Sequence, residues 1–346
     1  MTTTTLPFFA GELSAFDPSD SSVTETTSGN YNSAFSRCAL ALGNRFSTAT
    51  SPTWSAVTTL WFHAAMSPNS RSGGGQPQNT CLNFYSGSTV VAQLFVNTFT
   101  GSIFTWDTLT LKTLQGGVMT ALTPVYIPTD QFGSAALQLV DIMLVGGGSG
   151  SAALYLSGTQ VASATGLNHG SWPGITGVAV VALDDNFYGI VTNVSWSQII
   201  CDTTCTIGRV VITDNFSSES ATNTGWSTYG GGTKLANINE VVLSDATGIT
   251  SSTTGQVDTF YQSGLSYGTY NVLARAVSSR AAYTPTAPTQ VELVIRVSST
   301  NYLSSPVALA TYYQATFNSW TTNPATSAAW TASAAASIEA GVQSLT

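Results

Sequence analysis

The feature of this sequence that most restricts its fold is a succession of short apolar segments at short, regular intervals. A turn signal such as Ser86-Gly87-Ser88 or Thr100-Gly101 separates each segment from the next. None of the segments between residues 54 and 200 shows the 3.6-residue apolar period of a helix. About ten short strands in succession, bounded by Gly and Ser, predict a β-sandwich or a jelly roll.

The first part of the chain begins with a Thr/Ser-rich extension, which we expect to enter an edge strand at residues 39–46. Further strands are expected at residues 54–66, 81–85, 89–96, 102–106, 109–114, 136–145, 152–156, 160–162, 175–183 and 189–200. The rest of the chain repeats this style, with strands at residues 238–243, 256–261, 270–277, 290–298 and 307–317 and an edge strand at 342–345. In the strand at 270–277, Val272, Ala274 and Ala276 are expected on one face. One helical turn is expected at residues 332–338, and Gly341 ends it.

The stretch 189–216 separates these two sets of strands. Its first part alternates like a strand that closes a sandwich, and we expect Trp196 to pack inside or beneath that sandwich. Its second part turns, and residues 210–212 begin a new strand. Because 346 residues suffice for two domains that each bury a core, the sequence predicts one domain at 1–204 and a second at 205–346.

Cys201 and Cys205 are close enough to pair across a turn in residues 201–208, which we expect to connect the two domains. Free thiols are the first expectation in a chain with only four cysteines, and a disulfide is the second. A metal site is not expected, because no second cysteine pair and no histidine stands at ligand spacing. No other cofactor is expected.

The polarity of the surface must come from hydroxyl and amide groups, since only 8% of the residues are charged and 43% are hydrophobic. The net charge is -8, and the two lysines, Lys112 and Lys234, belong to no basic cluster, which argues against nucleic-acid binding. No apolar run is long enough to span a bilayer, and the N-terminus lacks the basic flank of a secretory signal. We therefore expect assembly in the cytoplasm and no membrane insertion. A hydroxyl-rich surface suits a protein in a dense assembly or outside cells.

No catalytic residues are expected. A glycosidase on such a sandwich would place two acids two residues apart on one strand, and no Glu-x-Asp or Glu-x-Glu occurs. Asp184 and Asp185 are adjacent, which indicates a solvated corner, with a calcium-binding pair as the second interpretation. Gly-Leu-Ser-Tyr-Gly at 264–268 matches a nucleophile elbow, but a strand follows it and both histidines lie upstream. We expect His63 to be packed or hydrogen-bonded on its strand and His169 to lie in a loop.

Three glycine runs, at 73–75, 146–148 and 230–232, are expected at hairpin tips, because none precedes a helix or a Gly-Lys-Ser/Thr motif. Exposed aromatic side chains in loops can stack on sugars. Trp172 and Tyr229 are the candidates for such a glycan contact. The alternative is that they cap the end of a sandwich or contact a neighbouring subunit.

Three motifs point to a protein family. The first is the hairpin at 137–166, in which Gln-Leu-Val-Asp-Ile-Met-Leu-Val, a glycine turn and Ala-Ala-Leu-Tyr-Leu-Ser-Gly follow one another. The second is Trp226 followed by Ile-Asn-Glu at 238–240 and Gly-Gln-Val-Asp-Thr-Phe at 255–260. The third is Asn-Pro-Ala-Thr-Ser-Ala-Ala-Trp-Thr at 323–331, with Gly341 behind it.

In order and spacing these motifs resemble a group of tailed-bacteriophage structural proteins that join a concanavalin A-like, laminin G-like jelly roll to a C-terminal β domain. The resemblance covers most of the chain and implies a component of the virion. Related chains often have acidic residues on the strand that ends the first domain. This chain has Val194-Ser195-Trp196-Ser197-Gln198 there, so we expect no ion-binding role for that corner.

The sequence thus predicts an all-β protein, a concanavalin A-like jelly-roll sandwich followed by a smaller β-sandwich domain. The resemblance implies a non-enzymatic virion protein displayed on the particle surface. The first expectation is a capsid decoration or minor capsid protein, homo-oligomeric within the particle, that docks on other virion proteins and contacts host surface glycans. The alternative is a tail-fibre or tail-tip adhesion protein that binds host polysaccharide, and a glycan-cleaving enzyme ranks last. The absence of coiled-coil heptads and shaft repeats places decoration ahead of a long fibre.

Overall fold

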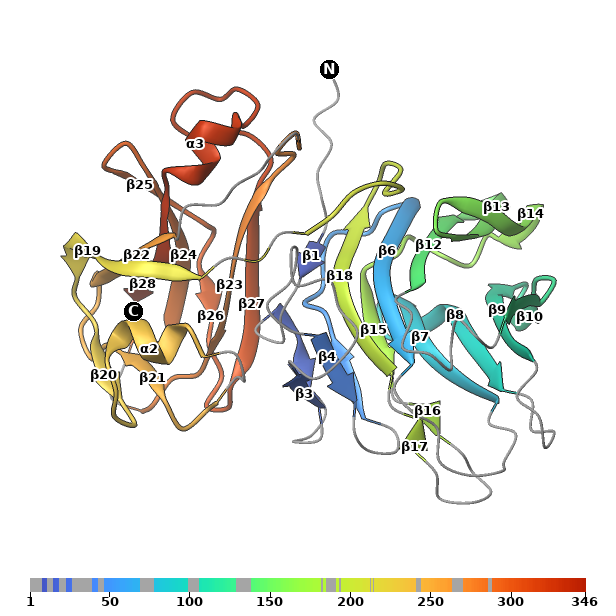
Figure 1. Ribbon diagram of the computed structural model, residues 1–346, viewed down its shortest axis with the longest axis horizontal. Helices are drawn as coiled ribbons and strands as arrows, with labels where there is room; N and C mark the ends of the chain where they lie inside the picture. The colour runs from blue at the N-terminus through green and yellow to red at the C-terminus, as the bar shows by residue number, and fades with distance from the viewer. Residues whose placement is uncertain are drawn as a thin grey trace. The chain divides into compact units, whose positions relative to one another are not determined.

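The chain is almost entirely β, as the sequence predicts (Figure 1). A computed structural model describes residues 8–10, 15–18, 23–26, 39–42, 47–68, 78–98, 106–128, 138–181, 183–184, 191–192, 194–211, 213, 215–240, 244–262, 270–285 and 288–346. Within these ranges the helices are short, and none of them has the length and apolar character needed to cross a membrane.

The described chain divides into two compact units. The first contains Phe8–Ala10 and the residues from Asp17 to Val211, and the second contains Ala15, Phe16 and the residues from Thr213 onward. The division falls after residue 212, whereas the predicted boundary follows residue 204. Residues 203–211 belong to the first unit because a hydrogen bond and an ion pair tie them to its sheet. Residues 210 and 211 form no strand.

The first unit contains two large antiparallel sheets. The first, called here the β6 sheet, has the order β14 (Thr159–His169), β13 (Gly147–Leu156), β12 (Gln138–Val145), β6 (Thr59–Pro68), β18 (Val194–Asp202), β4 (Ala39–Leu42) and β3 (Val23–Thr26), with β1 (Phe8–Ala10) also on β18. The second, called the β8 sheet, has the order β10 (Val118–Ala121), β9 (Trp106–Gln115), β8 (Thr89–Thr98), β7 (Gln78–Ser86), β15 (Gly177–Val181), β5 (Thr48–Thr50) and β2 (Asp17–Pro18), with β11 (Val125–Pro128) also on β9. A separate pair is formed by β16 (Leu183–Asp184) and β17 (Val191–Thr192).

Aromatic side chains join the two sheets into one sandwich. Phe62 of β6 packs edge-on against Phe84 of β7, with 5.5 Å between ring centroids, and against Trp196 of β18, with 6.4 Å. All three are fully buried, which confirms the prediction for Trp196. Burying a side chain such as Phe stabilises a fold by roughly 1.5–3 kcal/mol, so this cluster is a main source of stability for the first unit.

Most of the predicted strands of the first unit are present with shifted ends. β4 begins where the 39–46 strand was predicted, but it lies between β18 and β3 and is therefore not an edge strand. The strand predicted at 54–66 begins at Thr59, because residues 51–56 hydrogen-bond to residues 175–178 instead of entering the β6 sheet. The strand predicted at 160–162 extends over the whole of β14.

The second unit is built on a smaller antiparallel sheet, called the β28 sheet. Its order is β19 (Phe216–Thr224), β22 (Val257–Gln262), β28 (Glu339–Leu345), β24 (Gln290–Val297) and β25 (Thr300–Leu303), with β26 (Val307–Ala308) also on β24. Two further strand pairs are β20 (Ser227–Tyr229) with β21 (Gly248–Thr250) and β23 (Arg275–Ala281) with β27 (Gln314–Trp320). The core combines Leu293 and Val342 of the β28 sheet with Val277 of β23 and Ile249 of β21. Both small pairs therefore contribute to one core against the β28 sheet.

The second unit contains a short helix that the sequence did not predict. α2 (Lys234–Ile238) occupies the start of the strand predicted at 238–243, and Thr233 caps it by accepting a hydrogen bond from the backbone N–H of Ala236 at 3.1 Å. The glycine run 230–232 precedes α2, so the expectation that no glycine run precedes a helix is wrong. The predicted helical turn near the end of the chain is confirmed as α3 (Ala332–Ala336).

Two strands of the second unit differ from the prediction, one in its place in the sheet and the other in the face that is buried. The strand predicted at the edge over 342–345 is β28, which lies between β22 and β24, and Gly341 is inside it instead of ending a helix. β23 begins at Arg275, and its buried residues are Arg275 and Val277. The face predicted from Ala276 is therefore the wrong one, because a buried arginine interrupts the apolar alternation.

Candidate functional site

Three side chains able to exchange protons or hydrogen-bond a ligand form a row across the β6 sheet. His63 on β6 lies opposite Asp141 on β12, and Asp141 lies opposite Tyr155 on β13. Directly opposite residues share a face of a sheet, and their neighbours Phe62 and Ile142 point into the sandwich core. The row therefore lies on the outer face of the β6 sheet, away from the core.

Hydrogen bonds connect this row to a residue far along the chain. The Nδ1 atom of His63 donates to Oδ1 of Asp141 at 2.9 Å, and the Thr206 hydroxyl donates to the same oxygen at 2.9 Å. His63, Asp141 and Thr206 are each at most 1% exposed. The Nε2 atom of His63 has no hydrogen-bond partner within the described part of the chain. The prediction that His63 is packed and hydrogen-bonded on its strand is confirmed.

Residues 203–211 explain why this polar row is buried, and they are called the strap below. Asp202, at the end of β18, accepts hydrogen bonds from the backbone N–H groups of Thr203 and Thr204, at 2.5 and 3.2 Å, and pairs with Arg209. Further along, the strap reaches the β13–β14 turn, where a Cβ at Gly158 would lie 3.5 Å from Ile207. The strap therefore crosses the outer face of the β6 sheet and covers His63 and Asp141.

The two cysteines for which a disulfide was the second expectation lie near the end of β18 and on the strap. Cys201 lies opposite Phe62, so its side chain faces the sandwich core and is buried, whereas Cys205 is exposed on the strap. Both are free thiols, so the disulfide alternative is not realised. Burial, followed by the charge of Asp202, raises the pKa of Cys201, which makes it a poor nucleophile.

An aromatic pair stands on the outer face beside the strap. Trp61, two residues before His63 on β6, lies 5.5 Å from the ring of Tyr155 with the planes tilted by 34°. Both side chains are half-buried. Burial raises the pKa of Tyr155, and the charges of Cys205 and Asp141 add to this effect. Sequence reasoning missed this pair, although Trp61 and His63 stand at alternate positions of one strand, which places both on one face.

Exposed polar groups continue the same face onto β14. Gln160 lies opposite Tyr155, and its amide donates a hydrogen bond to the Ser163 hydroxyl at 3.1 Å. Both residues are exposed. The aromatic pair Trp61–Tyr155 and the polar pair Gln160–Ser163 are called the β6 outer surface below.

Trp172, one of the two predicted contact residues, is not available for stacking on a ligand. Its side chain is buried, its indole N–H donates to the backbone oxygen of Leu114 at 3.0 Å, and its ring stacks on His169 with 3.7 Å between centroids. The loop turns inward at Gly174, where φ is +138° and a Cβ would lie 2.8 Å from the Ala56 Cβ. The expectation of an exposed sugar-stacking tryptophan is therefore wrong.

His169 is the last residue of β14. The prediction that it lies in a loop is therefore wrong. Its Nδ1 atom donates to the backbone oxygen of Val145 at 2.7 Å, and its ring lies over Gly150, where a Cβ would be 2.5 Å from Nδ1. Burial lowers the pKa of His169, against the opposing effect of the hydrogen bond to Val145. The ring is therefore held neutral in the folded protein.

This neutral histidine predicts a pH dependence of stability. Because His169 binds a proton more weakly in the folded chain, its contribution is complete above its ordinary value of 6.5 and is lost as the pH falls below that value. We expect the urea midpoint of the first unit to fall between about pH 7 and pH 5, and His169→Gln to flatten part of this slope. An identical slope in wild type and variant would contradict the assignment to His169.

Tyr229, the other predicted contact residue, is half-buried in the second unit. Its hydroxyl hydrogen-bonds to that of Tyr313 at 2.8 Å, and its ring lies against Gly248, where a Cβ would be 2.7 Å from the ring. Burial and the hydrogen bond to Tyr313 raise the pKa of Tyr229. One face of its ring is therefore occupied by the protein, and its contact with a glycan or partner stays a prediction.

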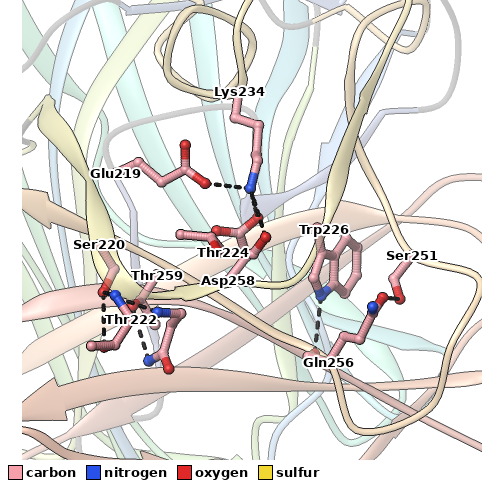
Figure 2. Close-up of polar contacts among 11 residues, drawn as sticks. Glu219, Ser220, Thr222, Thr224, Trp226, Lys234, Ser251, Gln256, Asp258 and Thr259 are labelled. Carbon is pink, nitrogen blue, oxygen red and sulfur yellow. Dashed lines mark hydrogen bonds and ion pairs between the residues drawn. The ribbon is translucent and has the colours of Figure 1, made fainter.

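A second polar cluster lies in the second unit, and Figure 2 shows it. Lys234 at the start of α2 lies between Asp258 of β22 and Glu219 of β19, and its Nζ atom is 2.9 Å from Oδ2 of Asp258. Nearby, the Trp226 indole N–H donates to the backbone oxygen of Gln256 at 3.0 Å. Sequence reasoning noted Lys234 only as a rare lysine, because its partners are distant in sequence.

The remaining predicted features carry no site. Asp184 is on β16, while Asp185, the elbow-like run at 264–268 and the glycine run at 73–75 lie outside the described residues. The glycine run at 146–148 lies at the turn of the β12–β13 hairpin, as predicted, and Gly147 and Gly148 are the first two residues of β13. Among the residues whose placement is described, no group of three His, Cys, Asp or Glu side chains could hold a metal ion.

Comparisons with known proteins give likenesses only at the level of solved structures, because no protein-family model and no curated protein matches the chain. The globular domain of calreticulin from T. cruzi is 10% identical over 58% of this chain and 89% of its own, with a TM-score of 0.41. An endo-beta-1,4-glucuronan lyase from Trichoderma reesei is 13% identical over 58% of this chain and 96% of its own, at 0.41. A carbohydrate esterase from the Shiga toxin-encoding bacteriophage phi24B is 10% identical over 57% and 98%, at 0.38. Nothing about the chemistry of this chain follows from these likenesses.

Proposed function

We propose that this protein is a non-enzymatic structural component of a bacteriophage particle, a capsid decoration or minor capsid protein that is displayed on the surface and docks on other virion proteins. The resemblance of three sequence motifs to phage structural proteins supports this proposal. The composition agrees with it, because a surface with few ions and many hydroxyls suits close packing in an assembly.

The strap over His63 and Asp141 is the observation that supports the non-enzymatic part of this proposal. A general base must come within hydrogen-bond reach of its substrate, and the strap covers both His63 and Asp141. His169 is likewise buried, beneath Trp172. His63, Asp141 and His169 are therefore engaged in holding the first unit together, while the β6 outer surface beside the strap stays accessible for binding.

The second candidate function is a tail-fibre or tail-tip adhesion protein that binds a host polysaccharide. The β6 outer surface favours it, because an aromatic pair beside an exposed amide and hydroxyl offers the two contacts that sugars use: an apolar ring face and hydrogen-bonding groups. The same surface also serves the glycan contact of a displayed capsid protein.

Substitution of either member of the aromatic pair should weaken binding in a host-polysaccharide array. We expect Trp61→Ala and Tyr155→Ala each to weaken binding about tenfold or more, since loss of an aromatic contact costs roughly 1 kcal/mol beyond its buried area. Val118→Ala is the matched control, because Val118 is an apolar side chain of the first unit that is 66% exposed on β10. Unchanged binding by both variants, or equal loss in the control, would rule out the β6 outer surface as the binding site.

The stability and host adsorption of particles assembled without this protein distinguish the two candidate functions. A decoration protein predicts that such particles lose physical stability on heating or dilution of salt but still adsorb to the host. An adhesion protein predicts stable particles that fail to adsorb. Particles that keep both properties would contradict both functions.

A further inference from the structure

The lysine cluster of the second unit brings an amine against a buried carboxyl group. The Nζ atom of Lys234 lies 2.9 Å from Oδ2 of Asp258 and contacts Oε1 of Glu219 (Figure 2). It also donates to the backbone oxygen of Thr224 at 3.2 Å. The three side chains come from α2, β22 and β19, so the folded chain assembles an amine, an acid and a second carboxylate at one point.

Asp258 differs from an ordinary surface partner of a lysine in the burial of its carboxyl group. Its carboxyl group is fully buried, and its Oδ1 atom has no hydrogen-bond partner among the described residues. Glu219, in contrast, keeps 34% of its side chain exposed, and Lys234 keeps 15%. A buried carboxylate with one unsatisfied oxygen is costly when ionised, so this position favours a neutral form of the group.

The pKa of Asp258 points the same way. Burial raises the pKa of Asp258, and the charge of Glu219 adds to this, while Lys234 and the backbone N–H of Trp226 act against it. Burial alone lowers the pKa of Lys234, but its bonds to Asp258 and Glu219 raise it overall. The lysine therefore holds its proton in the ion pair, and the transfer of this proton to the buried Asp258 is the step that produces a neutral amine beside a neutral acid.

We propose that Lys234 and Asp258 form an intramolecular isopeptide bond, with Glu219 as the proton-transfer group. The neutral Nζ attacks the carboxyl carbon of Asp258, and Glu219 takes one proton from the nitrogen as the C–N bond forms. Glu219 then gives this proton to the departing hydroxyl, the C–O bond breaks, and one water molecule leaves. Glu219 ends ionised as it began, and no oxidant or reductant is needed.

Such a bond ties the start of α2 to the second strand of the β28 sheet. It closes the chain between residues 234 and 258, which includes α2 and β21. A covalent closure of this kind restricts the unfolded chain in the way that a disulfide does, in a chain whose described cysteines are free. It would therefore raise the resistance of the second unit to heat and to force.

Intact mass spectrometry of the purified full-length protein tests the proposal. We expect the wild-type mass to be lower than the sequence mass by one water, and a proteolytic digest to contain one branched peptide that joins Lys234 to Asp258. Lys234→Arg, which keeps the charge, and Glu219→Gln, which keeps the shape, should both restore the full mass. Lys112→Arg is the control and should remain one water lighter than its sequence mass.

Lys234→Arg also distinguishes the cross-link from cyclisation of Asp258 with its own backbone, which loses a water without needing the lysine. A full wild-type mass after prolonged incubation of the folded protein at neutral pH would overturn the proposal and leave an ordinary ion pair. A water loss that persists in a folded Lys234→Arg variant would overturn it too. The wild-type digest decides the question even where a variant fails to fold.

Discussion

Gly341→Ala should unfold or severely destabilise the second unit, although alanine adds a single methyl group. Gly341 is in the middle of β28, opposite Thr259 of β22, and a Cβ there would lie 1.9 Å from the backbone oxygen of Asp258 and 2.8 Å from the Thr259 Cα. Both obstacles are backbone atoms of the neighbouring strand, so no side chain can move aside. Overpacking in a core costs about 1–3 kcal/mol, and we expect at least the upper part of that range because two hydrogen-bonded strands must separate.

Gly148→Ala is the matched control for this substitution. Gly148 is also inside a strand, β13, and a Cβ there would meet nothing within 4 Å. Hydrogen exchange of the backbone amides in the β28 sheet should rise sharply in Gly341→Ala and stay at the wild-type rate in Gly148→Ala. Equal protection of the sheet in all three proteins would contradict the close approach of β22 to β28.

Trp196→Ala should be the most destabilising single truncation in the first unit. Trp196 is fully buried between the two sheets and packs against Phe62, which in turn packs against Phe84. Removing a buried aromatic side chain typically costs about 3–5 kcal/mol, because the lost contacts leave a cavity that the surrounding sheets fill only in part. Urea unfolding of the first unit should show a free energy of unfolding lowered by this amount.

Trp196→Phe separates the packing of the ring from its polar atom. The Trp196 Nε1 atom has no hydrogen-bond partner in the described part of the structure, so phenylalanine loses ring volume but no hydrogen bond. We expect a clearly smaller loss than in Trp196→Ala. If the two variants are equally destabilised, the cavity argument is wrong and the indole N–H is the group that matters.

The strands of the first unit could be predicted because their apolar residues alternate in sequence. β7, β8 and β12 are each near the predicted positions, and Trp196 is buried as its place in the alternation requires. The same rule failed in β23. There the buried position is Arg275, whose guanidinium hydrogen-bonds to Gln262, and a count of apolar residues cannot anticipate a charged side chain on the inner face.

The helix α2 escaped prediction because it is a single turn. It has no apolar period to detect, and its one signal is the Thr233 cap, which is equally common in turns. Its position matters for function, since it begins with Lys234. A local feature too short for a sequence pattern therefore places the residue on which the proposed cross-link depends.

The candidate sites depend on contacts between residues far apart in the chain. His63 meets Asp141 across 78 positions, and Thr206 meets Asp141 across 65. Most of the strap belongs to the stretch 201–208, which was predicted to connect two domains because a new strand was expected to begin at residue 210. Only the packed structure shows that it lies on the β6 sheet. Trp172 illustrates the opposite error, since a tryptophan beside a proline in a loop gives no sign that its ring turns inward.

Electron microscopy of intact phage particles labelled through a tag on this protein tests the proposed function most directly. The proposal predicts label distributed over the head of every particle, because a decoration or minor capsid protein is displayed there. Label confined to the tail would contradict the capsid role and favour the adhesion function of the β6 outer surface. Absence of label from particles that are shown to be made in cells expressing the tagged protein would contradict a virion role of either kind.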